Sequence, residues 1–275
     1  MSFFSKVMVR FGSLFGAGAV DKKVAILYIA TGRYICFFDD FYASMEKNFL
    51  PGVPKTYFVW TDCERQFPDN VIKIPTKNLG WPYATLYRYK LFQQQWYKLK
   101  KFRYMFFVNA NMIAVRSIGD EILPSDKQGI VVTLHPGYYK NPVEKPYDRN
   151  PRSLACISYW ERKQGENYYM GGFNGGTARA FGKLIKTIAR NTEIDERNGI
   201  IALWHDESHL NRYMYDRRHF LILLPEYGFP EGGIGASFAT CAEFGRTYKF
   251  LIQNKANPKW GGHEFLRGQR EKPIC

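Results

Sequence analysis

The chain has 275 residues, of which 45% are hydrophobic and 17% aromatic, and it carries 39 Lys and Arg against 25 Asp and Glu. This composition excludes a disordered chain, a collagen-like fibre and a small fold that depends on disulfides. The formal net charge of +14 predicts attraction to polyanions, such as nucleic acid, anionic lipid or phosphorylated small molecules, although no zinc finger or RNA-binding signature is present.

The first half of the chain alternates between predicted strands and predicted helices. Apolar runs rich in β-forming residues predict strands at 24–30, 56–61, 71–74, 104–108 and 130–134. Apolar side chains at helical spacing predict helices at 39–48 and 82–95, the second with a proline near its first turn. This alternation indicates an α/β fold with a mostly parallel sheet.

The second half contains less regular segments. Residues 136–166 are rich in Pro, Tyr, Asn and Lys and predict a long irregular segment that covers a functional site. The glycine-rich residues 171–177 are expected to open a helix at 178–190, so that backbone amides approach a ligand and the helix start favours an anion. A tight turn between a strand and a helix explains these glycines equally well. A short helix or loop at 203–212, a strand at 220–224 and a basic tail after 257 complete the chain.

The cysteines and the N-terminal residues bear on the compartment. Five widely spaced cysteines without a Cys-x-x-Cys pair argue against a disulfide framework or a cysteine-rich zinc site and favour a reducing compartment. No apolar run reaches the roughly 18 residues of a transmembrane helix. Residues 1–22, with Lys6 and Arg10 before an apolar run, resemble a weak signal peptide, but a loose extension before the first strand is the favoured interpretation, and contact with a membrane surface is a third. We expect residues 23–275 to form one domain of a cytoplasmic protein, with peripheral membrane contact as the alternative.

Two adjacent carboxylates, Asp206 and Glu207, lie between His205 and His209 and directly follow Trp204 and the first histidine. An exposed, capped helix start explains this segment as well as a site does. Histidines at positions i and i+4 also suggest zinc, but a zinc-protease motif has Glu directly after the first histidine, and no third ligand is evident. A zinc hydrolase therefore stays open as an alternative.

A second polar segment, Asn109 and Asn111, follows the predicted strand at 104–108. Side chains at i and i+2 share one side, at the sheet edge where α/β proteins bind ligands. Two aspartates there would bind Mg²⁺ or Mn²⁺, but asparagine supplies no charge. A turn in which the asparagines bind backbone groups explains them equally well.

Taken in chain order, six motifs resemble those of glycosyltransferase family 6, which includes the ABO blood-group transferases, the α-1,3-galactosyltransferases and shorter bacterial and phage members. The motifs are Ala30-Thr31-Gly32-Arg33-Tyr34, Asn78-Leu79-Gly80-Trp81 through Arg88, Asn109-Ala110-Asn111, His135-Pro136-Gly137-Tyr138-Tyr139, the glycine segment at 168–177, and the segment at 204–213 with the letters WHDESHLNRY. The Asn-x-Asn form is similar to microbial members, which lack the metal-binding Asp-x-Asp of the animal enzymes.

The resemblance implies a single GT-A domain, a Rossmann-like fold that binds a uridine-diphosphate sugar. Such an enzyme transfers N-acetylgalactosamine or galactose to the 3-hydroxyl of a galactoside, including fucosylated ones, and keeps the α configuration. It implies no divalent metal, no other cofactor and no nucleic-acid partner. A UDP-galactose-specific α-1,3-galactosyltransferase is the near alternative. A zinc hydrolase and a non-enzymatic polyanion-binding protein are distant ones.

The resemblance also implies roles for individual residues. Glu207 matches the catalytic carboxylate and Asp206 a donor-sugar ligand. Residues matched to the nucleotide and its phosphates are Ile29, Ala30, Tyr34, Thr85, Arg88, Asn109 and Asn111. Met170 and Gly172 match the positions that contact the donor's 2-substituent, and the missing side chain at Gly172 favours N-acetylgalactosamine. The residues matched to the acceptor site are His135, Trp204 and Glu231.

Without a metal, other cations must offset the charge that develops on the leaving diphosphate. Arg88 is one candidate. The other two are Lys259 and Arg267 of the basic tail, where the family places basic residues, and this tail is expected to close over UDP and exclude water.

Overall fold

The computed structural model describes residues 23–161, 167–232 and 242–269. The predicted N-terminal extension, residues 1–22, lies outside this range. Within it, seven strands form one sheet in the order β3-β2-β1-β4-β7-β6-β8. Their bounds are β1 Val24–Ile29, β2 Lys55–Thr61, β3 Val71–Pro75, β4 Tyr104–Val108, β6 Ile130–Leu134, β7 Tyr169–Thr177 and β8 Leu221–Leu223.

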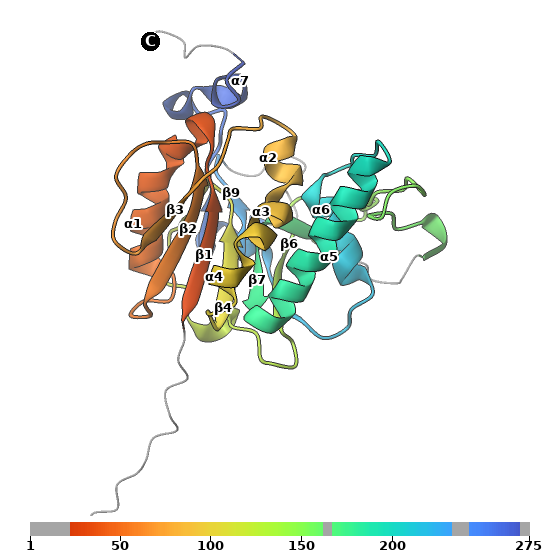
Figure 1. Ribbon diagram of the computed structural model, residues 1–275. Coiled ribbons are helices and arrows are strands. Elements are labelled where there is room, and N and C mark those ends of the chain that lie inside the picture. Colours follow the sequence, from red (N-terminus) through yellow and green to blue (C-terminus); the bar gives the residue numbers. More distant parts are fainter. Residues whose placement is uncertain (1–22, 162–166, 233–241, 270–275) are drawn as a thin grey trace, which may run out of the picture.

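The sheet is mostly parallel, which confirms the predicted fold class. β1 pairs in parallel with β2 and β4, β2 with β3, and β6 with β8, whereas β7 runs antiparallel to both β4 and β6. Figure 1 shows β1, β4 and β7 at the centre of the molecule.

The glycine-rich segment forms strand β7 in the interior of the sheet, and the predicted helix follows it, but the expectation that this helix start lies beside a ligand is wrong. A Cβ atom at Gly175 would lie 2.3 Å from the carbonyl oxygen of Met105, so only glycine lets the two strands approach this closely. The following helix, α5, starts after Thr177, which pairs with Tyr104 at the first residue of β4. Asn109 follows the opposite end of β4, so the start of α5 is remote from it.

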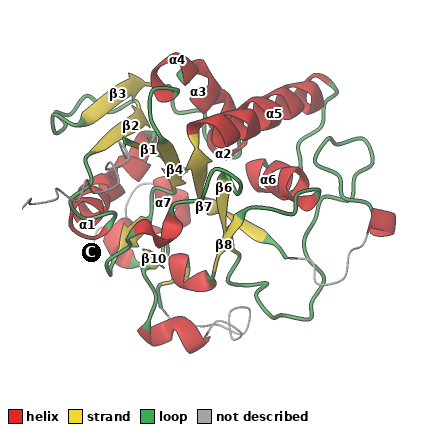
Figure 2. Ribbon diagram, turned by 90° about the horizontal axis from the view of Figure 1, so that it is seen from below, coloured by secondary structure: helices red, strands yellow, loops and turns green. Residues whose placement is uncertain are grey.

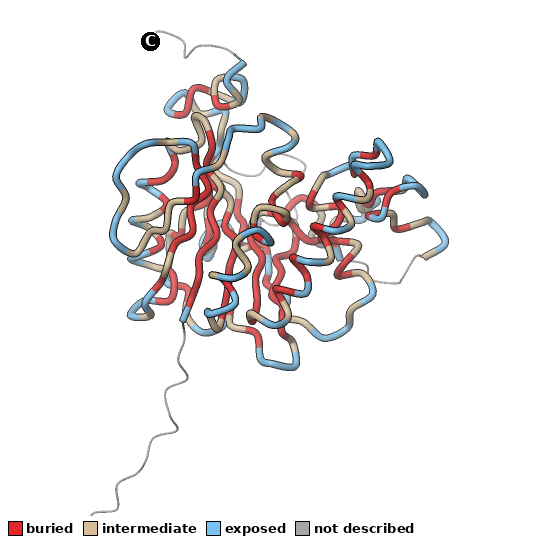
Figure 3. Tube along the Cα trace, viewed as in Figure 1, coloured by how far each residue is buried: buried red, intermediate tan, exposed pale blue. Residues whose placement is uncertain are grey.

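Helices cover both faces of the sheet (Figure 2). Helix α1 (Phe38–Asn48) covers one face, and α3 (Arg88–Gln94), α5 (Ala178–Arg197) and α6 (Asp206–Tyr215) cover the other. Alternate residues of β1 supply the two cores: Ile26 packs with α1, and Leu27 packs with α3 and α5. Figure 3 shows the inner strands as buried almost throughout, whereas the edge strands β3 and β8 are partly exposed.

The predicted helix at 82–95 is interrupted into α2 (Tyr83–Leu86), α3 and α4 (Trp96–Leu99). The backbone leaves helical geometry at Tyr87 and again at Gln95. The break at Tyr87 directly precedes Arg88, the first residue of α3, and so determines where the Arg88 side chain is positioned.

Short elements connect and complete the domain. They are β5 (Met112–Ala114), β9 (Phe229–Pro230), β10 (Phe250–Ile252), α7 (Gly262–Leu266) and the 3-10 helices η1 (Gly32–Phe37), η2 (Asp120–Ile122), η3 (Tyr159–Glu161), η4 (Pro225–Tyr227) and η6 (Pro258–Trp260). β5, β10 and β9 form a second sheet that brings the chain after Ile252 beside Asn111. Within the described part of 136–166, η3 is the sole regular element, as predicted. No helix among the described residues is long and apolar enough to cross a membrane.

Candidate active site

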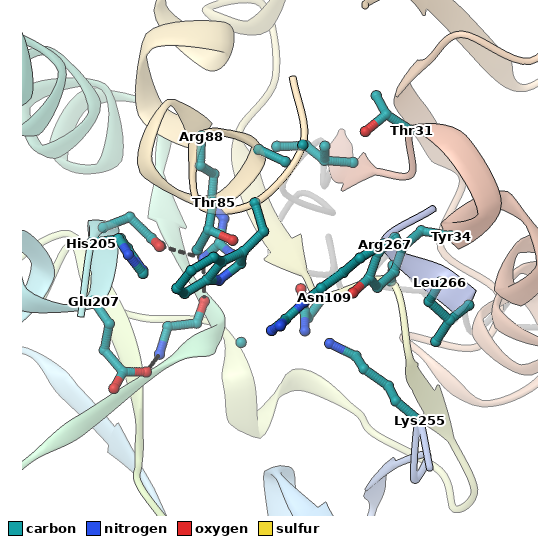
Figure 4. Close-up of a pocket in the computed structure, with 18 of the residues that line it drawn as sticks. Thr31, Tyr34, Thr85, Arg88, Asn109, His205, Glu207, Lys255, Leu266 and Arg267 are labelled. Carbon is teal, nitrogen blue, oxygen red and sulfur yellow. Dashed lines mark hydrogen bonds and ion pairs between the residues drawn. The ribbon is translucent and has the colours of Figure 1, made fainter. Parts of the chain in front are cut away.

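A cavity of about 330 Å³ lies at the carboxyl ends of β1 and β4, the position at which open α/β sheets bind ligands. Figure 4 shows His205 and Glu207 on one side of it and Tyr34, Lys255 and Arg267 on the other. Its lining includes Ile29, Thr31, Tyr34, Trp81, Thr85, Arg88, Asn109, Gly171, Gly172, Trp204, His205, Asp206, Glu207, Lys255, His263, Leu266 and Arg267.

Arg88 and Asp206 form a buried ion pair in the wall of the cavity. The guanidinium donates to the Asp206 carboxylate and, at 2.8 Å, to the carbonyl oxygen of Gly171, and it stacks 4.0 Å above the ring of Phe107. Burial raises the pKa of Asp206 to about 7, although Arg88 opposes the rise. Its other oxygen, Oδ1, is buried and has no hydrogen-bond partner among the described residues.

Glu207 is held by the backbone of β7. The amide of Gly171 donates to its Oε2 at 2.6 Å. Burial raises the pKa of Glu207, while the Gly171 amide, the hydroxyl of Tyr168 and the charge of Arg88 act against the rise. The Gly171 amide favours the ionised form of this cavity-lining carboxylate, whereas burial favours the neutral form.

Strained backbone precedes the two carboxylates. His205 has φ 54° and ψ −124°, an unfavourable conformation for a residue with a side chain. Ser208 accepts a hydrogen bond from the amide of Trp204 at 2.9 Å, and the buried carboxylate of Asp148 accepts one from the amide of Leu203 at 2.8 Å. These contacts hold the segment so that Trp204 and His205 both line the cavity.

Cations gather on the opposite side of the cavity. Lys255 lies 5.2 Å from the ring of Tyr34, and Arg267 stacks 4.9 Å above the ring of Trp81. Burial, followed by the charges of Arg267 and Arg88, lowers the pKa of Lys255 to about 8. Because burial and neighbouring cations destabilise the charged form of Lys255, this side chain is suited to binding an anionic ligand.

Lys255 is a residue that sequence reasoning missed, and Lys259 was favoured in its place. Lys259 points away from the cavity and pairs with Asp40 at 2.8 Å. Lys255 follows strand β10, which pairs with β5 just after Asn111. The sequence signal that could have identified Lys255 is the apolar triplet of β10, which ends three residues before it.

The two asparagines do not face one ligand together. Asn109 lines the cavity and donates from Nδ2 to Oδ1 of Asn111 at 2.9 Å. Asn111 is buried and donates to the carbonyl oxygen of Gln253 at 2.8 Å. The prediction that both carboxamides face the ligand is therefore wrong, because Asn111 joins β5 to the segment after β10.

Some other predicted residues lie outside the cavity lining. Ala30 is fully buried, with its amide bonded to Trp60. His135 packs against Tyr138 and Tyr168, and burial lowers its pKa to about 4. Glu231 accepts from the amide of Asn254 at 2.6 Å.

Met170 is also outside the lining, and it fills the space beside Gly172. A Cβ atom at Gly172 would lie 2.6 Å from Cε of Met170 and 3.3 Å from Sδ of Met112. The place that a Cβ atom would take is therefore already occupied, although Gly172 itself lines the cavity. The flexible end of Met170 occupies it.

The two histidines of the zinc hypothesis are not brought together. His205 precedes α6 and lines the cavity, whereas His209 is buried, with Nε2 3.7 Å from Asp195. Among the described residues, no cluster of three His, Cys, Asp or Glu side chains could hold a metal ion. The geometry gives the zinc hydrolase no support.

Comparison with known proteins identifies the family. The sequence profile of glycosyltransferase family 6 matches residues 18–237. The O-antigen biosynthesis glycosyltransferase WbnI of Escherichia coli is 34% identical over 248 residues, which cover 87% of this chain and 98% of that protein. Histo-blood group ABO system transferase 2 of Rattus norvegicus is 30% identical over 228 residues (78% of this chain, 66% of that protein). Globoside alpha-1,3-N-acetylgalactosaminyltransferase 1 of Gallus gallus is 28% identical over 220 residues (76% and 62%).

The matches to the animal proteins thus span less than two thirds of their length, whereas the bacterial protein is matched almost end to end. The mostly parallel α/β sheet agrees with the predicted GT-A fold. The resemblance seen in the motifs is confirmed across most of the chain. The protein belongs to glycosyltransferase family 6.

Proposed function

We propose that this glycosyltransferase moves N-acetylgalactosamine or galactose from a UDP-sugar to the 3-hydroxyl of a galactoside, in α linkage and with retention. The observation that carries the proposal is the division of charge across the cavity, with Glu207 on one side and Lys255 and Arg267 on the other. A diphosphate placed against the cations puts the anomeric carbon toward the carboxylates.

The cations support departure of UDP without a metal. Asn109 adds no charge, and Asn111 is engaged with Gln253, so this pair is a poor site for a divalent ion. One pair of unit charges about 4 Å apart is worth roughly 4 kcal/mol at an effective dielectric near 20. Lys255 and Arg267 can thus offset the charge that develops on the leaving diphosphate. Arg88 contributes less, since Asp206 already pairs with it.

Glu207 provides the charge that the sugar needs. A carboxylate beside the anomeric carbon stabilises positive charge on it, and can also attack it to form a glycosyl-enzyme. Front-side substitution, in which the leaving phosphate takes the acceptor's proton, keeps the configuration as well. Both routes use an ionised Glu207, for which the Gly171 amide is a suitable donor.

Donor preference depends on Met170. Because the end of Met170 fills the space beside Gly172, an acetamido group fits only where that side chain moves away. Methionine has three rotatable bonds and can move at low cost. We therefore retain N-acetylgalactosamine as the preferred sugar and galactose as the alternative.

Trp204 is the best-placed acceptor contact. It lines the cavity and keeps 48% of its surface exposed, so its ring can pack against a sugar face. His135 and Glu231 lie outside the lining, and their proposed contacts would require an acceptor that extends beyond the cavity.

The test is a transfer assay with UDP-GalNAc and UDP-Gal, using fucosylated and unfucosylated galactosides, with and without EDTA. We expect an α-1,3-linked product, identified by NMR, at an undiminished rate in EDTA. Glu207→Gln protein supplies the background rate. A β-linked product, or transfer that requires added Mn²⁺, would contradict the proposal.

A further inference from the structure

A stripe of four cations runs along the outer side of α5. Arg179, Lys183, Lys186 and Arg190 are spaced by four, three and four residues, which places them on one side of the helix. All four are exposed, while the other side of α5 is buried in the core.

Two further cations extend this stripe at the start of α5. Trp96 of α4 packs so closely on α5 that a Cβ atom at Gly182 would lie 2.2 Å from its ring. The carbonyl oxygen of Arg103 accepts from the amide of Ala178. Between these two contacts lie two exposed lysines, so they are beside the first turns of α5. We call the six residues the basic face: Lys100, Lys101, Arg179, Lys183, Lys186 and Arg190.

Nothing described in the structure neutralises the basic face. In the parts of the chain that the structure covers, none of the six makes an ion pair. The nearby acids are engaged elsewhere, with Glu193 on Arg197, Glu196 on Lys90, and Asp126 on Arg103. The six charges are therefore available to an external anion.

The sequence that precedes Lys23 indicates which kind of anion the basic face binds. The carbonyl oxygen of Lys23 accepts from the amides of Arg103 and Tyr104, and the carbonyl oxygen of Arg103 accepts from Ala178, so Lys23, which residues 1–22 precede in the sequence, lies near the start of α5. Their sequence is largely apolar and contains one acid, Asp21. Nucleic acid offers phosphates but no apolar phase, whereas an anionic bilayer offers both.

We propose that the basic face docks on an anionic lipid bilayer. The contact leaves the cavity accessible, because Lys100 and Lys101 precede the first residue of β4 and the cavity lies beyond the last one, at the opposite end of the strand. This proposal does not depend on the reaction proposed above.

The experiment is co-sedimentation of the full chain with vesicles of phosphatidylcholine alone or mixed with phosphatidylglycerol. One variant carries Lys183→Gln, Lys186→Gln and Arg190→Gln. The matched control removes three exposed cations elsewhere, through Lys47→Gln, Arg218→Gln and Arg246→Gln. Circular dichroism checks that both variants fold.

We expect the chain to bind the mixed vesicles and to release them as salt rises. The affinity of the basic-face variant for the mixed vesicles should be roughly a hundredfold lower, at about fivefold per cation. The affinity of the control should stay much closer to that of the parent chain. Equal losses in the two variants would show a general charge effect and overturn the proposal. So would failure of the parent chain to bind mixed vesicles, or loss of duplex DNA or RNA binding in the basic-face variant without loss of vesicle binding.

Discussion

The guanidinium of Arg88 and the carboxylate of Asp206 form an ion pair that is almost wholly buried, with 7% and 1% of the two side chains exposed. Arg88 is the first residue of α3 and Asp206 the first of α6, so the pair joins two helices that are 118 residues apart. Glu207 follows Asp206 directly. The pair therefore helps to fix the Glu207 carboxylate relative to β7.

Replacing Arg88 by leucine should lower the free energy of unfolding by about 3 to 5 kcal/mol, because it leaves Asp206 buried without its partner. Urea denaturation measures the change. The matched control is Lys90→Gln, which removes the half-exposed pair with Glu196 and should cost no more than about 1 kcal/mol. Equal costs for the two variants would argue against a structural role for the buried pair.

Asp206 should give stability a pH dependence of known sign. Burial raises its pKa from 3.8 to about 7, so between these values the folded chain holds a proton that the unfolded chain has released. The contribution of Asp206 to the free energy of unfolding therefore falls as pH rises from about 4 to 7 and levels off above that. Urea denaturation across this range, compared with Asp206→Asn, isolates the effect. A stability difference between the two proteins that does not vary with pH would contradict it.

Lys255→Gln should weaken UDP binding about ten- to a hundredfold, as expected for loss of a charged hydrogen-bond donor. Lys259→Gln is the matched control and should bind UDP normally, because its side chain pairs with Asp40 outside the cavity. Titration calorimetry measures both. Since the pKa of Lys255 in the free protein is lowered to about 8, UDP affinity should fall as pH rises through 8, and this fall should be smaller in the variant. A larger loss at Lys259 would reverse the assignment.

Glu207→Gln should lower kcat at least a hundredfold, since the amide cannot stabilise positive charge at the anomeric carbon. Glutamine keeps an oxygen for the Gly171 amide, so binding of UDP should change little. Steady-state kinetics with the purified variant, alongside UDP titration, separates these effects. Turnover close to normal would remove Glu207 from the catalytic role.

Met170→Ala should raise kcat/KM for UDP-GalNAc relative to UDP-Gal, because it empties the space beside Gly172. Gly172→Ala should act in the opposite direction, since its Cβ atom would itself take up the space that the acetamido group needs. Gly245→Ala is a suitable control, as its Cβ atom would meet only Phe229, at 3.9 Å. An unchanged donor ratio in both test variants would separate Met170 from donor choice.

Local patterns were enough to predict most strands and the polar segment around Glu207. Apolar runs such as 24–30 and 104–108 form strands because a strand inside the sheet buries their apolar side chains. β7 was not predicted because its glycines are typical of a turn. Glycine is needed there because the backbones of β4 and β6 pass very close to β7, which no local sequence pattern shows. Lys255 was missed for a similar reason. It reaches the cavity through pairing of β10 with β5, more than a hundred residues away in sequence.

One glycine ties several of these features together. The amide of Gly171 donates to Glu207, its carbonyl oxygen accepts from Arg88, and a Cβ atom there would lie 3.4 Å from both Asp206 and Glu207. The same strand carries Met170 and Gly172, which we propose govern the choice of sugar. Mutational drift that broadens or switches the substrate range through this strand will therefore tend to alter turnover too, and the two properties should evolve together rather than separately.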